Sequence, residues 1–75
     1  MSKALNKRIA DAFGKIYDRG DAGLDYMDGH VEMDAELMQY FYDDKVETLS
    51  KADKTRLADM LETVVADMAC DLETF

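Results

Sequence analysis

The sequence predicts an all-α protein, a small three- or four-helix bundle in which residues 1–75 form a single domain. Apolar residues recur at intervals of three and four along most of the chain, which is the period of a helix with one buried face. Proline, the strongest helix breaker, is absent. The regular alternation of apolar and polar residues that indicates a half-buried strand is also missing.

The first predicted helix covers residues 3–19. Its apolar positions fall on one face at helical spacing: Leu5, Ile9, Ala12, Phe13, Ile16 and Tyr17.

Residues 20–29 have two open interpretations, a second short helix or a continuation of the first. The helical spacing is extended by Gly20, Leu24, Met27 and Val31. Against a continuation, each glycine inside a helix costs about 1 kcal/mol relative to alanine. If the helix does continue, Gly20 and Gly23 would let another backbone approach closely.

The next helix is predicted over residues 34–48, with Asp34 as its N-cap. Its apolar stripe consists of Met38, Tyr42, Val46 and Leu49, flanked by Leu37 and Phe41. The three consecutive rings of residues 40–42 cannot all face one core. At least one of them is therefore expected to be partly exposed or to contact a partner.

The last helix is expected to begin after Ser50, which with Asp53 forms a variant of the capping box. Its apolar stripe is Leu57, Leu61, Val64, Met68, Leu72 and Phe75, widened by Met60 and Val65. A core built from so short a chain is marginal, and a single cysteine excludes an internal disulfide. We therefore expect a homodimer whose interface is formed by Val64, Val65, Met68, Leu72 and Phe75.

Charge is strongly uneven along the chain. The formal net charge is −8, which disfavours direct binding to nucleic acid or to an anionic membrane and favours a basic partner. Residues 20–44 contain no Lys or Arg. In a helical conformation a single row of carboxylates, with neighbours about 5–6 Å apart, would be formed by Asp18, Asp21, Asp25, Asp28 and Glu32.

This acidic segment has two interpretations, a solvated surface or a face that binds a basic partner. The binding hypothesis leads to a non-enzymatic protein that docks on a basic protein surface, for example on a nucleic-acid-binding site that it mimics or blocks. The candidate partner-binding residues are Asp21, Asp25, Asp28, Glu32, Asp34, Glu36, Tyr40, Asp43 and Asp44. Tyr26, Phe41 and Tyr42 are further candidates for aromatic anchors. The alternative is an assembly subunit that oligomerises through its last helix.

Catalytic and metal-binding motifs are not recognisable. Cys70 and His30 are the only Cys/His pair; Cys70 is expected to be buried and inert, and His30 to have a surface or helix-capping role. Two registers of a calcium-binding loop fail, and no dinucleotide-binding or phosphate-binding loop is present. We therefore expect no enzyme activity, no metal and no cofactor. A single free cysteine without an export signal favours the cytoplasm.

One segment resembles a known class of proteins. Residues 17–26, with the sequence Tyr-Asp-Arg-Gly-Asp-Ala-Gly-Leu-Asp-Tyr, are similar to a Tyr-Asp-Arg-Gly-x-Ala segment of small phage-encoded proteins. The basic run and Pro-His pair that follow in that family are replaced here by Met-Asp-Gly-His at residues 27–30. The resemblance implies a phage or mobile-element origin. Small acidic proteins from such sources often block host nucleic-acid enzymes, which leads us to expect an inhibitor of a host defence or DNA-handling protein. The resemblance assigns no functional residue.

Overall fold

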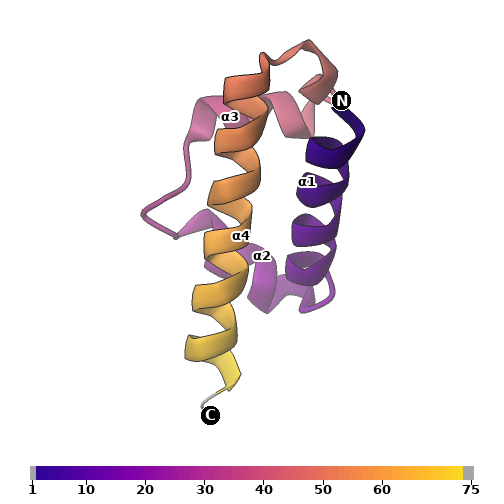
Figure 1. The fold of residues 1–75 in the computed structure, drawn as a ribbon. Coiled ribbons are helices and arrows are strands. Elements are labelled where there is room, and N and C mark those ends of the chain that lie inside the picture. The colour runs from indigo at the N-terminus through magenta and orange to yellow at the C-terminus, as the bar shows by residue number, and fades with distance from the viewer. Residues whose placement is uncertain (1, 74–75) are drawn as a thin grey trace.

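The computed structural model describes residues 2–73, and within this range all regular structure is helical. The elements in chain order are α1 (Ser2–Tyr17), α2 (Gly20–Asp28), α3 (Ala35–Tyr42), a single 3-10 turn η1 (Val46–Thr48) and α4 (Lys51–Glu73). The predicted all-α class is confirmed. The helix α4 is the longest, and its C-terminal turns extend beyond the end of α1 (Figure 1).

The helices α1 and α4 lie side by side and run in the same direction, so that α2, α3 and their connections return the chain between them (Figure 1). Both N-terminal ends therefore lie at one end of the molecule. No helix in residues 2–73 has the length and apolar character that crossing a membrane requires.

The chain turns sharply between α1 and α2, which makes residues 20–28 a second helix rather than a continuation of the first. Gly20 has φ of +63°, a left-handed conformation that glycine adopts without steric cost and that ends the right-handed path of α1. Gly23 then packs against the last turn of α1. A Cβ at Gly23 would lie 2.1 Å from the carbonyl oxygen of Ile16. The close backbone approach expected at Gly23 therefore occurs, and the two backbones are those of α1 and α2.

The helix α3 begins as predicted but ends earlier than residue 48. Asp34 is its N-cap, and its Oδ1 accepts hydrogen bonds from the backbone N–H groups of Glu36 at 2.9 Å and Leu37 at 3.4 Å. At the other end Asp44 has φ of +59°. The N–H of Lys45 then bonds to the carbonyl of Tyr40, a Schellman arrangement that closes the helix.

One hydrophobic core holds the helices together. Its buried members are Ile9, Ala12, Ile16, Met27, Leu37, Met38, Leu57, Ala58, Met60, Leu61, Val64 and Met68. The predicted stripes are confirmed at Ile9, Ala12 and Ile16 of the first helix and at Leu57, Leu61, Val64 and Met68 of the last helix. The rings of Phe13 and Phe41 pack on the core's edge with centroids 4.5 Å apart, which links α1 to α3.

Three apolar residues predicted to lie on the buried stripes are exposed instead. Val31 is 92 % exposed because α2 has already ended and the chain is in a turn. Tyr42 is 55 % exposed because α3 stops there, so the predicted stripe from Met38 to Leu49 does not continue on one helix. Tyr17, the last residue of α1, is also exposed. Tyr40 and Tyr42 are both exposed, which agrees with the expectation that at least one of the three rings of residues 40–42 is partly exposed.

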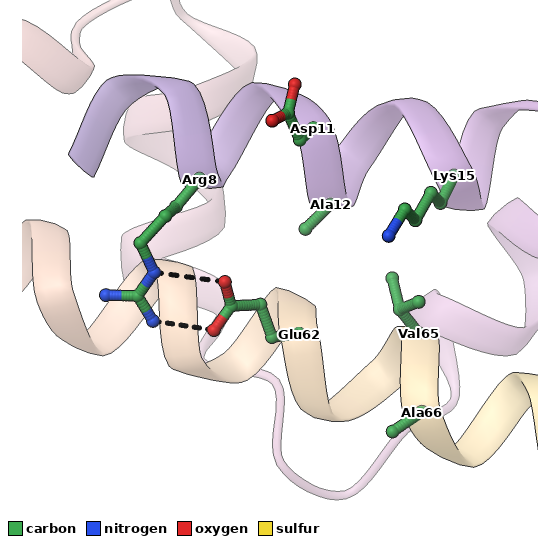
Figure 2. A pocket seen from close by; sticks show the side chains of 7 residues that line it. All are labelled: Arg8, Asp11, Ala12, Lys15, Glu62, Val65 and Ala66. Atoms are coloured by element: carbon green, nitrogen blue, oxygen red, sulfur yellow. Dashed lines mark hydrogen bonds and ion pairs between the residues drawn. The ribbon is translucent and has the colours of Figure 1, made fainter. Parts of the chain in front are cut away.

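Two polar contacts that the sequence analysis missed connect distant parts of the chain. Arg8 of α1 makes a bidentate contact with Glu62 of α4, with distances of 3.0 Å for Nε–Oε2 and 2.6 Å for Nη2–Oε1 (Figure 2). Lys54 is only 3 % exposed, and its Nζ lies 3.6 Å from Oε2 of Glu47. Lys54 lies three residues before Leu57 and so continues the buried stripe of α4 toward its N-terminus. This spacing could have predicted the burial of Lys54.

The predicted dimer interface is only partly available on this surface. Val64 and Met68 are buried in the chain's own core, so these two side chains cannot contact a second subunit in this fold. The reason is that α1 and α2 already cover this face of α4. Val65 and Leu72 are partly exposed, and Phe75 lies outside the described residues.

Candidate functional site

The helix α2 carries an acidic row on its outer face. Asp21, Asp25 and Asp28 are exposed, whereas Gly23 and Met27 are buried against the rest of the protein. Residues spaced by four and three positions are neighbours on a helix surface. The row has three carboxylates and not the predicted five, because Asp18 lies in the turn before α2 and Glu32 in the turn after it.

The protein itself does not neutralise this row. Four basic side chains form ion pairs with other carboxylates: Lys7 with Asp11, Arg8 with Asp59 and Glu62, Lys54 with Glu47, and Arg56 with Asp34. No ion pair to Asp21, Asp25 or Asp28 is formed within residues 2–73. Their charges are therefore available to a positively charged group from outside.

Two of these carboxylates destabilise α2 by their position in the helix. Asp25 and Asp28 lie in the last turn, at the negative end of the helix dipole, and this turn contains no basic residue. Each carboxylate also has a like-charged neighbour three or four residues away, which costs a few tenths of a kcal/mol per pair. Asp21, in the first turn, is the one placed favourably. The sequence therefore keeps this acidic row although two of its three members destabilise the helix that carries them.

Asp34 is already occupied within the chain. Its carboxylate caps α3 and also contacts Nη2 of Arg56. The backbone N–H groups at the start of α3, first that of Leu37, lower the pKa of Asp34, and Arg56 lowers it further. Asp34 therefore holds α3 in place and does not contribute a free charge to the acidic surface.

The other predicted binding residues are distributed around α3. Glu32, Glu36 and Tyr40 are exposed. Asp43 is exposed too and accepts a hydrogen bond from Nε2 of Gln39 at 3.0 Å. Asp44 lines a different hollow, next to Asn6 and Glu47 on the α1 side. The structure therefore does not gather all nine predicted residues into one patch.

A hollow of about 200 Å³ separates α2 from α3 and adjoins the acidic row. It is lined by Met27, Asp28, His30, Met33, Ala35, Met38 and Tyr42. Asp28 and Tyr42 line the same hollow, and burial followed by the charge of Asp28 raises the pKa of Tyr42. Asp28 thus connects the row on α2 to the exposed ring at the end of α3.

The loop after α2 is fixed to α4 by His30. The ring of His30 is only 8 % exposed, and its Nε2 lies 2.7 Å from Oδ2 of Asp67. Its Nδ1 accepts the backbone N–H of Glu32 at 3.2 Å, so the proton of the neutral ring is on Nε2 and is donated to Asp67. His30 was expected to have a surface or helix-capping role; instead it links the loop to α4, and both ring nitrogens are in use.

A second link from α2 to α4 is formed by Tyr26. Its hydroxyl donates a hydrogen bond to Oδ2 of Asp71 at 2.5 Å. This bond, followed by burial and the charge of Asp71, raises the pKa of Tyr26 to about 12. Tyr26 is therefore engaged inside the molecule, and Tyr40 and Tyr42 are the tyrosines of the acidic segment that present exposed rings.

Cys70 is exposed, contrary to the expectation of a buried thiol. It follows Met68 by two residues, a rotation of about 200° on a helix, which places it on the face of α4 opposite to the core. In the part of the chain that the structure describes, no three His, Cys, Asp or Glu side chains are arranged to hold a metal ion.

A further hollow of about 340 Å³ lies between α1 and α4 (Figure 2). Its apolar side chains are Ala12, Val65 and Ala66, and Lys15 extends over it from α1. Arg8 and Glu62 close one end through their bidentate contact. Val65, which was predicted to contact a second subunit, thus lies in a surface depression.

Comparison of the chain with protein-family models, with curated proteins and with solved structures gives no match. Function is therefore inferred from the chemistry of the chain's own surface.

Proposed function

We propose that this chain is a non-enzymatic acidic binding protein whose α2 face docks on a basic site of a protein partner. The observation that supports this proposal is the row of Asp21, Asp25 and Asp28, which is exposed and forms no ion pair within residues 2–73. Complementary charge across an interface speeds the encounter and selects the partner. The net charge of −8 adds a long-range field of the same sign.

In its most specific form, the proposal is an inhibitor of a host defence or DNA-handling protein, acting in the cytoplasm of the host. Carboxylates on one helix face are about 5–6 Å apart, close to the spacing of successive phosphates. The row on α2 can therefore occupy a site built for a nucleic-acid backbone. The resemblance of residues 17–26 to a segment of phage-encoded proteins is the second reason for this form.

Affinity capture from the native host at low salt, followed by mass spectrometry, tests the proposal. Capture is expected to be lost with the triple variant Asp21→Lys, Asp25→Lys, Asp28→Lys. The control, Asp11→Lys, Asp53→Lys, Asp59→Lys, changes the net charge by the same amount on other helices and is expected to retain the partner. It also removes the exposed ion pairs Lys7–Asp11 and Arg8–Asp59, which contribute little to stability. Circular dichroism checks that both variants keep their helicity. Equal capture by the wild type and the first variant would rule the mechanism out.

The captured protein then distinguishes a mimic from other binders. An inhibitor of nucleic-acid binding is expected to compete with DNA or RNA for the captured protein, and the competition is expected to weaken as ionic strength rises. A complex that forms on the captured protein without displacing nucleic acid would support the general proposal and contradict this specific form.

The second candidate function is an assembly subunit that forms a homodimer along the groove between α1 and α4. The observation in its favour is the depression around Val65, which continues along α4 as far as Ala69. Small side chains on a helix surface permit close packing of another helix. Light scattering of the wild type and of Ala66→Lys, at low and moderate salt, tests this candidate. A monomer at micromolar concentrations would contradict it, and a dimer insensitive to salt would support it.

A further inference from the structure

We propose that the hollow between α2 and α3 receives the side chain of one lysine or arginine of the partner, with its apolar stem on the methionines and its charged end between Asp28 and Tyr42. This inference rests on the proposed function, because it names the contact that anchors the acidic face of α2.

The floor of the hollow suits an unbranched aliphatic stem. Met27 and Met38 are buried, Met33 is partly buried, and all three side chains line the same space. Thioether side chains are flexible and polarisable, so they adapt to the shape of an inserted group. Ala35, on the first turn of α3, has a short side chain, so the hollow is less enclosed on that side.

The rim of the hollow suits a cation. Asp28 forms no ion pair within residues 2–73, and Tyr42, which lines the same hollow, is more than half exposed. A cation over an aromatic ring is attracted by the electrons of the ring face, and a neighbouring carboxylate adds direct charge attraction. Asp25 lies one helical turn away on the same helix and extends the negative field toward the approaching group.

Other ligand classes fit this space less well. An anion would be repelled by Asp28. A wholly apolar side chain would cover Asp28 without pairing it, and burial of an unpaired charge is costly. Lysine and arginine satisfy both parts of the hollow, because their stems bury on apolar surface while their charged ends remain at the rim. His30 does not add a further ligand, since both of its ring nitrogens are engaged with Asp67 and Glu32.

Methionine methyl spectroscopy with hexalysine and, separately, hexaarginine as probes tests the proposal on the full chain. With ¹³C-methyl-labelled methionine, the signals of Met27, Met33 and Met38 are expected to shift as a probe is added. Met60 and Met68 are core residues that do not line the hollow, so their signals are expected to remain in place. Shifts of all the core methionines to the same extent, or of none of them, would overturn the proposal.

The matched variants are Ala35→Leu and Ala52→Leu. Both replace an exposed alanine near the start of a helix without a change of charge, but only Ala35 borders the hollow. Ala35→Leu is expected to weaken binding of hexalysine about tenfold, or about 1.4 kcal/mol. Ala52→Leu is expected to bind like the wild type.

The triple charge reversal on α2 separates this proposal from the one on which it rests. If that reversal abolishes binding of both probes while Ala35→Leu binds normally, the acidic face binds cations but the hollow does not receive them, and this inference is overturned alone. If hexalysine and hexaarginine bind the triple variant as well as the wild type, the acidic face itself is not the site and both proposals fail.

Discussion

Gly23 of α2 approaches the backbone of α1 so closely that a Cβ at this position would lie 2.1 Å from the carbonyl oxygen of Ile16. The nearest atom belongs to the backbone of Ile16, which cannot rotate away as the end of a flexible side chain does. The packing of α2, and with it the direction of the acidic row, therefore depends on the absence of a side chain at one residue.

Gly23→Ala is expected to destabilise the protein by about 3 kcal/mol, because the added methyl group overpacks a rigid contact. Gly14→Ala is the matched control. Gly14 lies within α1 and nothing lies within 4 Å of its Cβ position, so this change is expected to stabilise the protein by about 0.5–1 kcal/mol. Urea denaturation followed by circular dichroism measures both. Similar stabilities for the two variants would show that the approach of α2 to α1 is not as close as described.

Asp28→Asn is expected to raise the free energy of unfolding by about 0.3–1 kcal/mol, because it removes a negative charge from the C-terminal end of α2 and from the neighbourhood of Asp25. The same change is expected to weaken binding to a basic partner. Thermal denaturation and titration with hexalysine measure the two effects on one sample. Lower stability of the variant would indicate that Asp28 has an internal partner.

Tyr26 is expected to titrate separately from an ordinary tyrosine, with a pKa of about 12, because its hydroxyl is bonded to Asp71. The folded-state pKa is raised above the unfolded value of about 10, so the stability from this bond is complete below pH 10 and is lost as the pH rises toward 12. Absorbance at alkaline pH follows the tyrosinate signal. Tyr26→Phe is expected to remove this late step, and Asp71→Asn to move it to lower pH.

Asp34→Ala is expected to destabilise α3 at neutral pH, because both the N-cap bonds and the contact with Arg56 are lost. The folded-state pKa of Asp34 is lowered, so its contribution is complete above the ordinary carboxyl range and is lost as the pH falls through that range and below it. Denaturation of wild type and variant from neutral to acidic pH measures this. The difference between them is expected to shrink toward low pH; a constant difference would contradict the role of the ionised carboxylate.

Local patterns predicted the helices well where one strong signal was present. The buried faces of α1 and α4 followed the apolar spacing through Ile9, Ile16, Leu57 and Leu61, and the caps at Asp34 and Ser50 formed as expected. The predicted acidic segment is exposed at Asp21, Asp25 and Asp28. These features depend on neighbours within one or two helical turns, which the spacing of residues records directly.

The contacts that shape the candidate site were not predictable in this way. Spacing predicted the cap at Asp34 but not its contact with Arg56, and it did not predict that His30 would contact Asp67. Left-handed backbone at Asp44, a residue other than glycine, ended α3 early and left Tyr42 exposed beside Asp28. The contacts of Asp34 and His30 depend on groups that are distant in the chain, and the end of α3 depends on one backbone angle.

The amino-acid sequence by itself determined that this protein is helical, that its core follows the apolar stripes of its first and last helices, and that its negative charge gathers in the middle third. Only the tertiary structure decided which carboxylates remain free and which hollow they border. The physical reason is that helix formation and amphipathic burial are set by residues a few positions apart. Whether a charge is neutralised, by contrast, depends on which side chain the fold brings within a few ångströms of it.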